Sequence, residues 1–494
     1  MKVNPNVFRE YDIRGIAGEE YSPKEIAMYE KWYGPFPGIT LTPDVVLQIG
    51  KAYGTIIRRT GGSRVVVGYE VRPQAEKLRE PFIEGVLSTG CAVLDADVAL
   101  TPLIYFATAF WNLDGGVNIT GSHNVYFYNG FKLMKKGMWP LFGGELQGMR
   151  TMIERDDVLL EKKGERTSFP ILSAYEQYLT EHIKLSRPLH IVIDAGNGTA
   201  GLFAPKLFSK LGCKITELHT EPDATFPYHE PDPENPHNVE DLGEKVRAER
   251  ADLGIAFDAD GDRVGFVDEQ GSYVPADLPL LVFAKDVLSR NPGKKILFDT
   301  KCSQLLGELI PQYGGVPFMH RTGHAPIKET LRKDPEVIFA GEQAAHFYFV
   351  EDYFRIDDGL YAAARMLELF SKQQAPFSSL FAGIPPRVRT PEIKLPCADE
   401  VKFEVIKDIT KNLKTQYPSI LIDGIRIQVT KTAWGVIRAS NTSPYITVRV
   451  EGISEDEVLQ VKNILADELE KHPEIQDRLN RKKVAVLEGK LAWV

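Results

Sequence analysis

The sequence has few cysteines and no pattern that would pair them. Four occur in 494 residues (Cys91, Cys213, Cys302 and Cys397), without a CxxC pair or a dense spacing. Such usage is typical of a reduced compartment. The N-terminus lacks a signal-peptide pattern, and the longest apolar runs, such as 279–284, fall far short of the about 20 residues that cross a bilayer. We therefore expect a cytoplasmic protein without a membrane segment.

The sequence also lacks an excess of cationic residues. Lys and Arg number 59, Asp and Glu number 68, and the net charge is −9. This balance argues against sequence-independent nucleic-acid binding, which needs cations facing phosphates. It leaves room for an anionic small substrate, because a basic pocket can lie within an acidic surface. The length and the ordinary hydrophobic share of 43% predict a globular chain of three or four domains.

Three segments share one plan, a short β-branched run followed by a polar loop and a helix-like stretch. They are RVVVGYEVR (64–72), HIVIDAGNGTAG (190–201) and KILFDTKCS (295–303). Strands that alternate with helices predict βαβ units and mainly parallel sheets. Ligands bind such sheets where loops leave the carboxyl ends of strands.

Other segments suggest how these units are joined. The charged stretch 161–170 predicts a linker before a helix that begins near Ser173, and 265–275 predicts a hairpin. A segment rich in Pro and Gly (375–392) precedes a region of alternating strands and a helix that begins near Ser454. That last region predicts a small antiparallel α+β domain.

The first loop that carries candidate functional residues is NITGSHNVYFYNGFKL (118–133). A strand-like run ends in a small turn, predicted to be exposed, that presents Ser122 beside His123, and Lys132 follows. A serine after a glycine on a tight turn is accessible, as a nucleophile or phosphate carrier must be. The alternative is a hydroxyl that only stabilises the turn.

The second loop is AFDADGDRVGFVD (256–268), which places Asp258, Asp260 and Asp262 at alternate positions after an apolar strand. Carboxylates at this spacing suit Mg²⁺, which binds few protein oxygens and keeps a position for a phosphate oxygen. An EF-hand is excluded because no Glu stands at its twelfth position. The alternative is an acidic surface turn.

Two further loops carry polar groups. VIFAGEQAAHFYF (337–349) places Glu342 and His346 between two strand-like runs, where they could bind sugar hydroxyls or simply face solvent. VIRASNTSPYITVRVEG (436–452) gathers a guanidinium, hydroxyls and an amide, the donor set of a phosphate site; the residues are Arg438, Ser440, Asn441 and Thr442. The alternative for this segment is a plain turn between two strands.

In this order the four loops resemble those of the α-D-phosphohexomutase family, and most closely its bacterial phosphomannomutase/phosphoglucomutase branch. TGSHN with YNGFK is similar to the family's phosphoserine loop, DADGDR to its metal loop, GEQAAH to its sugar loop and RASNTSP to its phosphate loop. FREYDIRG (8–15), TFPYHEPDPENPHN (225–238), RTGHAPIK (321–328) and RIDDGLYAAARMLE (355–368) extend the match over essentially the whole chain.

The resemblance implies three related α/β domains and a C-terminal α+β domain around a central cleft. We place them at 1–170 (phosphoserine loop), 171–273 (metal loop), 274–385 (sugar loop) and 386–494 (phosphate loop). It also implies a magnesium-dependent intramolecular phosphotransferase that acts on a phosphorylated hexose, mannose or glucose. A bisphosphorylated hexose would serve as intermediate and activator, and the 1- and 6-phosphates would exchange.

The resemblance assigns roles as well. Ser122 carries the phosphoryl group, and Arg14, Lys132 and His324 lie near the transfer centre. Mg²⁺ is held by Ser122, Asp258, Asp260 and Asp262. Substrate is bound by His123, Arg263, Glu342 and His346, and its non-reacting phosphate by Tyr11, Lys301, Arg438, Ser440, Asn441 and Thr442. Because a phosphoserine and three aspartates outweigh one Mg²⁺, the cations of this set are required.

The sequence departs from the family pattern at four positions. Val125 stands where Pro is usual, Ala344 and Ala345 where Ser-Gly is usual, and Ser443 where Thr or Glu is common. Three alternative functions stay open. The first is a phosphoglucosamine mutase, which the Gln of GEQ favours. The other two are a synthase that releases the bisphosphorylated sugar and a non-catalytic sugar-phosphate-binding protein.

Overall fold

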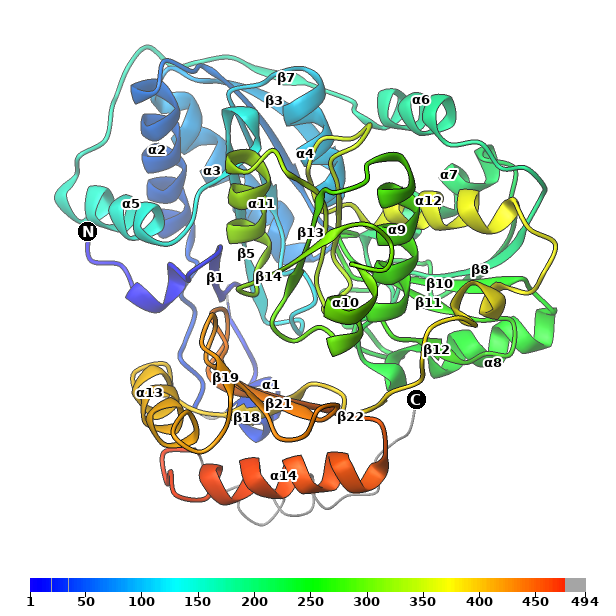
Figure 1. Ribbon diagram of the computed structural model, residues 1–494. Coiled ribbons are helices and arrows are strands. Elements are labelled where there is room, and N and C mark those ends of the chain that lie inside the picture. Colours follow the sequence, from blue (N-terminus) through cyan, green and yellow to red (C-terminus); the bar gives the residue numbers. More distant parts are fainter. Residues whose placement is uncertain (19, 34, 476–494) are drawn as a thin grey trace.

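The computed structural model describes residues 1–18, 20–33 and 35–475, and these form four β-sheets. Three mixed α/β domains lie together, and a fourth domain with an antiparallel sheet lies below them in Figure 1. This arrangement confirms the predicted fold class. The domain boundaries after residues 170, 273 and 385 stay predictions, and residues 476–494 of the predicted fourth domain lie outside the described residues.

The first domain is built on a mixed sheet with strand order β1–β5–β4–β2–β3–β7, and β6 pairs with β5. Its strands are β1 (Ile13–Ile16), β2 (Arg64–Tyr69), β3 (Ala92–Val98), β4 (Gly115–Ile119), β5 (Tyr128–Lys135), β6 (Trp139–Pro140) and β7 (Arg166–Ser168). Its helices are α1 (Pro23–Tyr33), α2 (Pro43–Arg59), α3 (Pro73–Ser88), α4 (Thr101–Phe110) and α5 (Gly144–Arg155). The stretch 161–170 is therefore more than the predicted linker, because β7 pairs parallel with β3 and extends the sheet.

The second domain has the strand order β12–β11–β10–β8–β9. Its strands are β8 (His190–Asp194), β9 (Lys214–Leu218), β10 (Leu253–Phe257), β11 (Val264–Val267) and β12 (Tyr273–Val274), and its helices are α6 (Leu172–His182), α7 (Ala204–Lys210) and α8 (Glu240–Glu249). The helix predicted near Ser173 and the hairpin predicted at 265–275 are confirmed by α6 and by the antiparallel pair of β11 and β12.

The third domain has the strand order β14–β13–β15–β16. Its strands are β13 (Lys295–Asp299), β14 (Val316–His320), β15 (Val337–Gly341) and β16 (Phe347–Phe349), and its helices are α9 (Asp277–Arg290), α10 (Gln304–Leu309), α11 (His324–Lys333) and α12 (Gly359–Ser371). Asp358 caps α12 by accepting the Tyr361 N–H, which satisfies a donor that the helix start leaves free.

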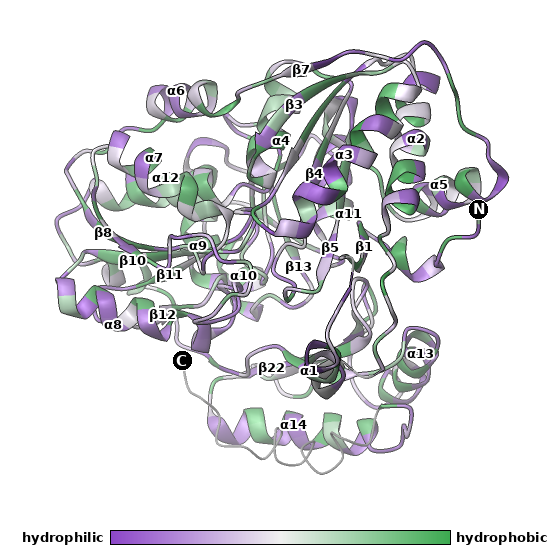
Figure 2. Ribbon diagram, turned by 180° about the vertical axis from the view of Figure 1, so that it is seen from behind, coloured by the Kyte–Doolittle hydropathy of each residue, from purple (hydrophilic) through white to green (hydrophobic). Residues whose placement is uncertain are grey.

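The fourth domain is an antiparallel sheet with the order β17–β22–β21–β20–β19, and β18 pairs with β22. Its strands are β17 (Val388–Arg389), β18 (Ile393–Pro396), β19 (Ser419–Ile420), β20 (Ile425–Gln428), β21 (Trp434–Ala439) and β22 (Tyr445–Gly452), and its helices are α13 (Lys402–Leu413) and α14 (Glu455–Leu469). Ser454 caps α14, as predicted. Helix α14 carries apolar and polar bands (Figure 2), which suits a helix that covers one face of the sheet.

The first three domains repeat one arrangement of strands. In each, a central strand (β2, β8 or β13) lies between two parallel neighbours, and one neighbour continues into an antiparallel partner. The connections to that partner are the loops 120–127, 258–263 and 342–346, three of the four loops with predicted chemistry. They occupy equivalent places at the carboxyl ends of parallel strands, where such sheets bind ligands.

Buried apolar side chains form one core across the first three domains and a separate core in the fourth. One continuous cluster of buried side chains includes Ile104 of the first domain, Ile193 of the second and Phe283 of the third. The fourth domain has a core of its own, to which Val448 and Val461 belong. Among the described residues, none of the helices combines the length and apolar character that a bilayer crossing requires.

Candidate active site

One cavity lies where all four domains meet, and it gathers the predicted residues. Every residue predicted to act in catalysis or to bind substrate lines it: Tyr11, Arg14, Ser122, His123, Lys132, Arg263, Lys301, His324, Glu342, His346, Arg438, Ser440, Asn441 and Thr442. The three aspartates predicted to bind metal are fully buried, and two of them contact Lys132 in the cavity wall.

Ser122 lies on a turn with left-handed backbone geometry (φ +51°), which a non-glycine residue rarely adopts. Its N–H donates to Thr120 Oγ1 (2.8 Å), and its hydroxyl is 3.3 Å from His123 Nδ1. The prediction of an exposed turn is wrong, because Ser122 is only 3% exposed. Side chains from the other domains line the cavity that the turn faces. Burial, with Arg263 nearby, lowers the pKa of His123, so its imidazole is neutral.

Two residues that the sequence analysis missed hold the Ser122 turn. Glu70 accepts the Gly121 N–H (2.7 Å) and pairs with Arg72, and both side chains are fully buried. Arg72 in turn donates to the carbonyl oxygens of Ser122 (3.0 Å) and Asn124. Glu70 and Arg72 follow β2, the central strand beside β4. Their place at the carboxyl end of that strand is the signal that could have found them.

Asp258, Asp260 and Asp262 form a compact acidic group. One oxygen of each lies within 4.8 Å of the others. Asp258 Oδ2 and Asp260 Oδ1 are buried and have no hydrogen-bond partner among the described residues. Burial and the two neighbouring carboxylates raise the pKa of Asp258 well above its ordinary value. Such oxygens need a cation, and hard carboxylate donors fit Mg²⁺.

Lys132 on β5 supplies the positive charge nearest to this group. Its Nζ donates to Asp260 Oδ2 (2.9 Å) and also to Asp262. Burial lowers the pKa of Lys132, but the two carboxylates outweigh it and raise that pKa above the ordinary value. Lys132 therefore stays charged. Lys132 bonds two of the three aspartates, and a divalent cation would add charge beside the carboxylate oxygens that lack hydrogen bonds.

Charged residues hold both ring nitrogens of His324. Its Nε2 is 3.1 Å from Asp12 Oδ2, which also accepts from Arg14 (3.2 Å). Its Nδ1 is 3.2 Å from Lys328 Nζ, and Lys328 pairs with Asp357 at 2.6 Å. When Lys328 donates to Nδ1, the ring hydrogen is on Nε2 and points to Asp12. Burial raises the pKa of Asp12, but His324 and Arg14 outweigh it and hold that pKa well below its usual range.

The sugar loop places Glu342 and His346 between β15 and β16. Glu342 accepts from the Gly323 N–H (2.8 Å) and the Tyr348 hydroxyl (2.7 Å), and His346 Nδ1 is 3.1 Å from it. The other ring nitrogen of His346 is 3.3 Å from Asp262 Oδ1. Burial lowers the pKa of His346, but Asp262 and Glu342 outweigh it and raise that pKa to about 9. A charged His346 thus links the sugar loop to the aspartate group.

The phosphate loop follows β21 in the fourth domain. Arg438 donates from Nε to Asp423 Oδ2 (2.8 Å), which fixes its guanidinium at the cavity wall. Asn441 donates to the Tyr11 hydroxyl (2.6 Å), a contact between the fourth and first domains. Ser440 lies between Arg438 and Asn441 in the sequence and is 4% exposed. The loop therefore presents several donors to the cavity.

The cavity also contains charged residues that the sequence analysis did not single out. Glu392 accepts from Lys301 (3.1 Å), and Lys394 is 3.8 Å from Asp232. Glu234 is nearby, and burial raises its pKa. Glu392 and Lys394 lie at the end of the segment rich in Pro and Gly and just beyond it, where no motif marked them. The cations that line the cavity suit a phosphorylated ligand: Arg14, Lys132, Arg263, Lys301, Lys394 and Arg438.

Comparison with known proteins agrees with this geometry. Residues 5–157, 173–271 and 276–388 match phosphoglucomutase/phosphomannomutase alpha/beta/alpha domains I, II and III, and residues 392–468 match the C-terminal domain. The phosphomannomutase/phosphoglucomutase of Pseudomonas aeruginosa (strain PAO1) is 38% identical over 465 residues, which cover 94% of this chain and 95% of that protein. The chain belongs to the phosphoglucomutase/phosphomannomutase family.

Other members of the phosphoglucomutase/phosphomannomutase family are also similar. The phosphoglucomutase of Neisseria gonorrhoeae is 36% identical over 477 residues, which cover 96% of this chain and 98% of that protein. A solved structure of a family protein from Burkholderia thailandensis has a TM-score of 0.83 and 33% identity, and 99% of each chain is covered. The family resemblance stated from the motifs is thereby confirmed.

Proposed function

We propose that the chain is a hexose-phosphate mutase that interconverts the 1-phospho and 6-phospho forms of mannose, glucose or both. One observation carries this proposal: Ser122 and the phosphate loop line a single cavity, and the buried aspartate group contacts Lys132 in the wall of that cavity. A protein that only binds sugar phosphates has no use for a serine on a left-handed turn beside such a group. The family relationship supports the reaction class.

Ser122 would carry the phosphoryl group that is transferred. An oxygen on Ser122 and the carboxylates of Asp258, Asp260 and Asp262 would hold Mg²⁺, and the oxygens of Asp258 and Asp260 that lack hydrogen bonds among the described residues support this set. When bound, the ion would offset negative charge on the phosphoryl oxygens. Lys132, held against the same carboxylates, would contribute a fixed positive charge.

His324 is the residue that we assign to the hydroxyl proton. Carboxylate partners raise the pKa of Lys132, so its ammonium does not release a proton readily, and an arginine side chain is not deprotonated in proteins. An imidazole exchanges a proton near neutral pH. Asp12 and Lys328 contact its two nitrogens, so one of these contacts would open when that nitrogen meets the substrate hydroxyl.

The reaction would proceed in two transfers. In the first, a sugar hydroxyl oxygen bonds to phosphorus as the bond from phosphorus to Ser122 Oγ breaks, which leaves a bisphosphorylated hexose. The intermediate then turns within the cavity and returns its other phosphoryl group to Ser122. The same bisphosphorylated hexose, supplied as activator, would phosphorylate an unmodified Ser122. His123 and Arg263 line the cavity and would contact the phosphates.

The remaining cavity residues would bind the substrate at both ends. Glu342 would accept from the 3- and 4-hydroxyls, which glucose and mannose share. Its carboxylate already accepts protein hydrogen bonds, yet its two oxygens offer about four acceptor positions in total. The non-reacting phosphate would be bound by Tyr11, Lys301, Arg438, Ser440, Asn441 and Thr442.

The preferred sugar depends on the wall beside Glu342. Ala344 lines the cavity there and offers a methyl group where the family usually offers a hydroxyl. Rates measured side by side on mannose, glucose and glucosamine phosphates would decide between the main proposal and a phosphoglucosamine mutase. A clear preference for glucosamine phosphate would favour that alternative.

The variant Ser122→Ala tests the central assignment. We expect it to lose mutase turnover, because no other group can receive the phosphoryl group in its place. The matched control is Ser289→Ala, whose hydroxyl bonds the Asp286 carbonyl oxygen at an exposed helix end. Undiminished turnover of Ser122→Ala would refute the proposal.

Intact-mass measurement separates the remaining alternatives. A phosphoryl group should be present on the wild-type protein, absent from Ser122→Ala, and lost when hexose phosphate is added. A binding protein would keep the same mass throughout. A synthase would release the bisphosphorylated sugar as its main product, and product analysis detects this.

A further inference from the structure

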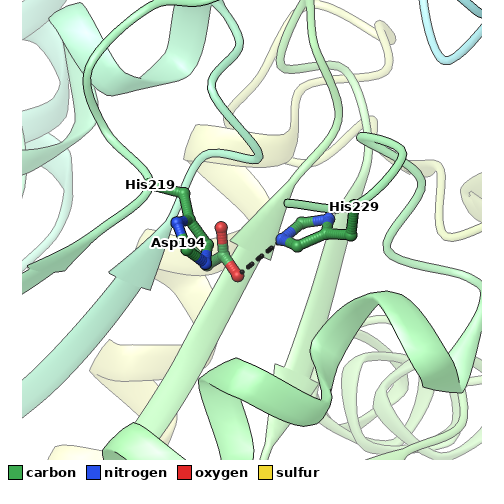
Figure 3. A group of neighbouring side chains, drawn as sticks. All are labelled: Asp194, His219 and His229. Atoms are coloured by element: carbon green, nitrogen blue, oxygen red, sulfur yellow. Dashed lines mark hydrogen bonds and ion pairs between the residues drawn. The ribbon is translucent and has the colours of Figure 1, made fainter. Parts of the chain in front are cut away.

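A second group of potential metal ligands lies in the second domain, among residues that do not line the cavity. Asp194 ends β8, His219 follows β9, and His229 lies in the connection from 219 to 236. One donor atom from each lies within 4.8 Å of the others. Figure 3 shows the three side chains pointing toward one another, with a contact drawn between Asp194 and His229. No role has been assigned to any of them above.

The hydrogen bonds of His229 call for a cation at this point. Its Nδ1 is 2.9 Å from the Glu230 carbonyl oxygen, which can only accept, so Nδ1 carries the ring hydrogen. Its Nε2 is 3.1 Å from Asp194 Oδ2, a fully buried carboxylate oxygen. With Nδ1 protonated, the neutral ring turns a lone pair toward that oxygen. Only a proton on Nε2 or a metal ion between the two relieves this opposition.

His219 is fixed in a way that suits a metal ligand. Its Nε2 is 3.2 Å from Asp241 Oδ2, and its ring stacks on Tyr228 with centroids 4.0 Å apart. The side chains of His219 and His229 are 10% and 12% exposed, so both are nearly enclosed. Metal-binding histidines commonly have a carboxylate or a carbonyl oxygen beside the ring, as both do here.

The equivalent place in the third domain has a different chemistry. Asp299 ends the central strand β13 as Asp194 ends β8, yet it accepts from the Thr322 hydroxyl (2.9 Å) and the Gln343 N–H (3.2 Å). Those donors satisfy the carboxylate without a cation. In the second domain Asp194 Oδ1 accepts the Gly196 N–H (2.8 Å), but Oδ2 faces the His229 imidazole, which is a donor to a carboxylate only when its facing nitrogen is protonated.

We propose that Asp194, His219 and His229 form a second metal site, separate from the aspartate group and specific for a transition metal such as Zn²⁺. Two imidazole nitrogens and one carboxylate oxygen are zinc ligands, whereas Mg²⁺ prefers oxygen alone. Ligands about 2.0–2.2 Å from a tetrahedral ion lie ~3.3 Å apart, close to the 3.1 Å between His229 and Asp194.

A metal at this site would affect the active-site cavity through the connection 219–236, which contributes to both. The connection 219–236 also carries Asp232 and Glu234, which line the cavity, and Asp232 accepts from Arg263 (3.4 Å). An ion bound by His219, His229 and Asp194 would tie this connection to the ends of β8 and β9. We expect it to restrain the cavity wall that the second domain contributes.

Zinc binding to the full-length protein tests the proposal, with Zn²⁺ as the probe and saturating Mg²⁺ to occupy the aspartate group. Equilibrium dialysis followed by metal analysis should give wild type one zinc equivalent more than His219→Gln or His229→Gln. The matched control is His237→Gln, an exposed histidine in the same region that pairs with Glu240. It should bind zinc as wild type does. Equal zinc content in all four proteins would overturn the proposal.

Hydrogen exchange on wild type gives a second test that needs no variant. Zinc should slow amide exchange in residues 219–236 by ordering that connection, while exchange in the fourth domain stays unchanged. If zinc binds and exchange in 219–236 does not slow, the proposed site is wrong even when a substituted protein fails to fold.

Discussion

At the scale of single residues, the Lys132 ammonium lies between two fully buried carboxylates, Asp260 and Asp262. Replacing it in Lys132→Met removes the cation that contacts both Asp260 and Asp262, and leaves His346 beside Asp262 and Arg263 beside Asp258. Removing one partner of a buried ion pair costs about 3–5 kcal/mol, so we expect the free energy of unfolding in EDTA to fall by that amount. Added Mg²⁺ should then raise the melting temperature of the variant by more than it raises that of wild type.

The control for this prediction is Lys136→Met, directly after β5 and at the surface. Lys136 is 59% exposed and pairs with Asp114 at 3.3 Å. A surface pair contributes about 0–1 kcal/mol, so this variant should unfold much as wild type does, with or without Mg²⁺. Equal stability of Lys132→Met and wild type in EDTA would contradict the charge balance described for the aspartate group.

Gly121 shows how closely the serine turn is packed. A methyl group on it would lie 2.5 Å from Arg72 Nη1 and 2.5 Å from the Tyr128 carbonyl oxygen. Gly121→Ala should therefore displace Arg72, which holds the Ser122 carbonyl oxygen. A misplacement of about 1 Å can cost ~10²-fold in rate, so we expect kcat to fall by that factor while the fold is kept.

Gly148→Ala is the matched control, because a methyl group there meets nothing within 4 Å. It lies inside α5, where alanine is more favourable than glycine by roughly 0.5–1 kcal/mol. Steady-state kinetics on both variants, with circular dichroism to check folding, measures the contrast. Unchanged kcat in Gly121→Ala would mean that Arg72 is not needed to place Ser122.

At the scale of elements, Asp358 connects the start of α12 to α6. It accepts from the Tyr361 N–H (2.9 Å), from the hydroxyl of Tyr175 on α6 (2.9 Å to one oxygen) and from the Tyr353 hydroxyl. Burial raises the pKa of Asp358 to about 6, although these hydrogen bonds oppose the shift. The folded state therefore binds this proton more tightly than the unfolded state, in which the pKa is about 3.9.

The sign of the pH effect follows from that difference. Stabilisation from the bound proton is fully present below the unfolded pKa and is lost as the pH rises through about 6. Asp358→Asn cannot ionise, so its free energy of unfolding relative to wild type should increase by about 3 kcal/mol between roughly pH 4 and pH 7. Denaturant unfolding across that range measures it, and a pH-independent difference would contradict the raised pKa.

The elements and the four loops could be predicted because each is local in the sequence. Apolar runs marked β8, β10 and β13, and the loop after an apolar strand placed Asp258 and Glu342 at strand ends. Groups that act across the chain could not be predicted. Arg72 acts on Ser122 from 50 positions away, and the burial of Ser122 depends on side chains from the other domains.

At the scale of the whole molecule, the fourth domain is joined unequally to its neighbours. On the side of the third domain, buried Asp277 accepts from Arg389 (3.0 Å) and Arg449 (2.9 Å). On the side of the first domain, the side-chain contacts include the pair of Arg9 with Asp399 and the Asn441 bond to Tyr11. Because the fourth domain also has its own core, we expect it to pivot on Asp277 and to open on the Arg9 side.

Arg9→Ala tests this pivot because it removes the ion pair that joins the fourth domain to the first. Arg9 and Asp399 are 14% and 16% exposed, so the pair is partly buried and worth about 1 kcal/mol. That amount corresponds to about a 5-fold change in the balance of open and closed forms. We expect KM to rise about 5-fold with little change in kcat, because in the proposed binding mode the substrate phosphate would bridge the phosphate loop to the other domains. Solution scattering should show a more extended variant without ligand and profiles that coincide with wild type when bisphosphorylated hexose is bound. If the profiles of variant and wild type coincide in both states and KM is unchanged, the fourth domain does not open on the Arg9 side.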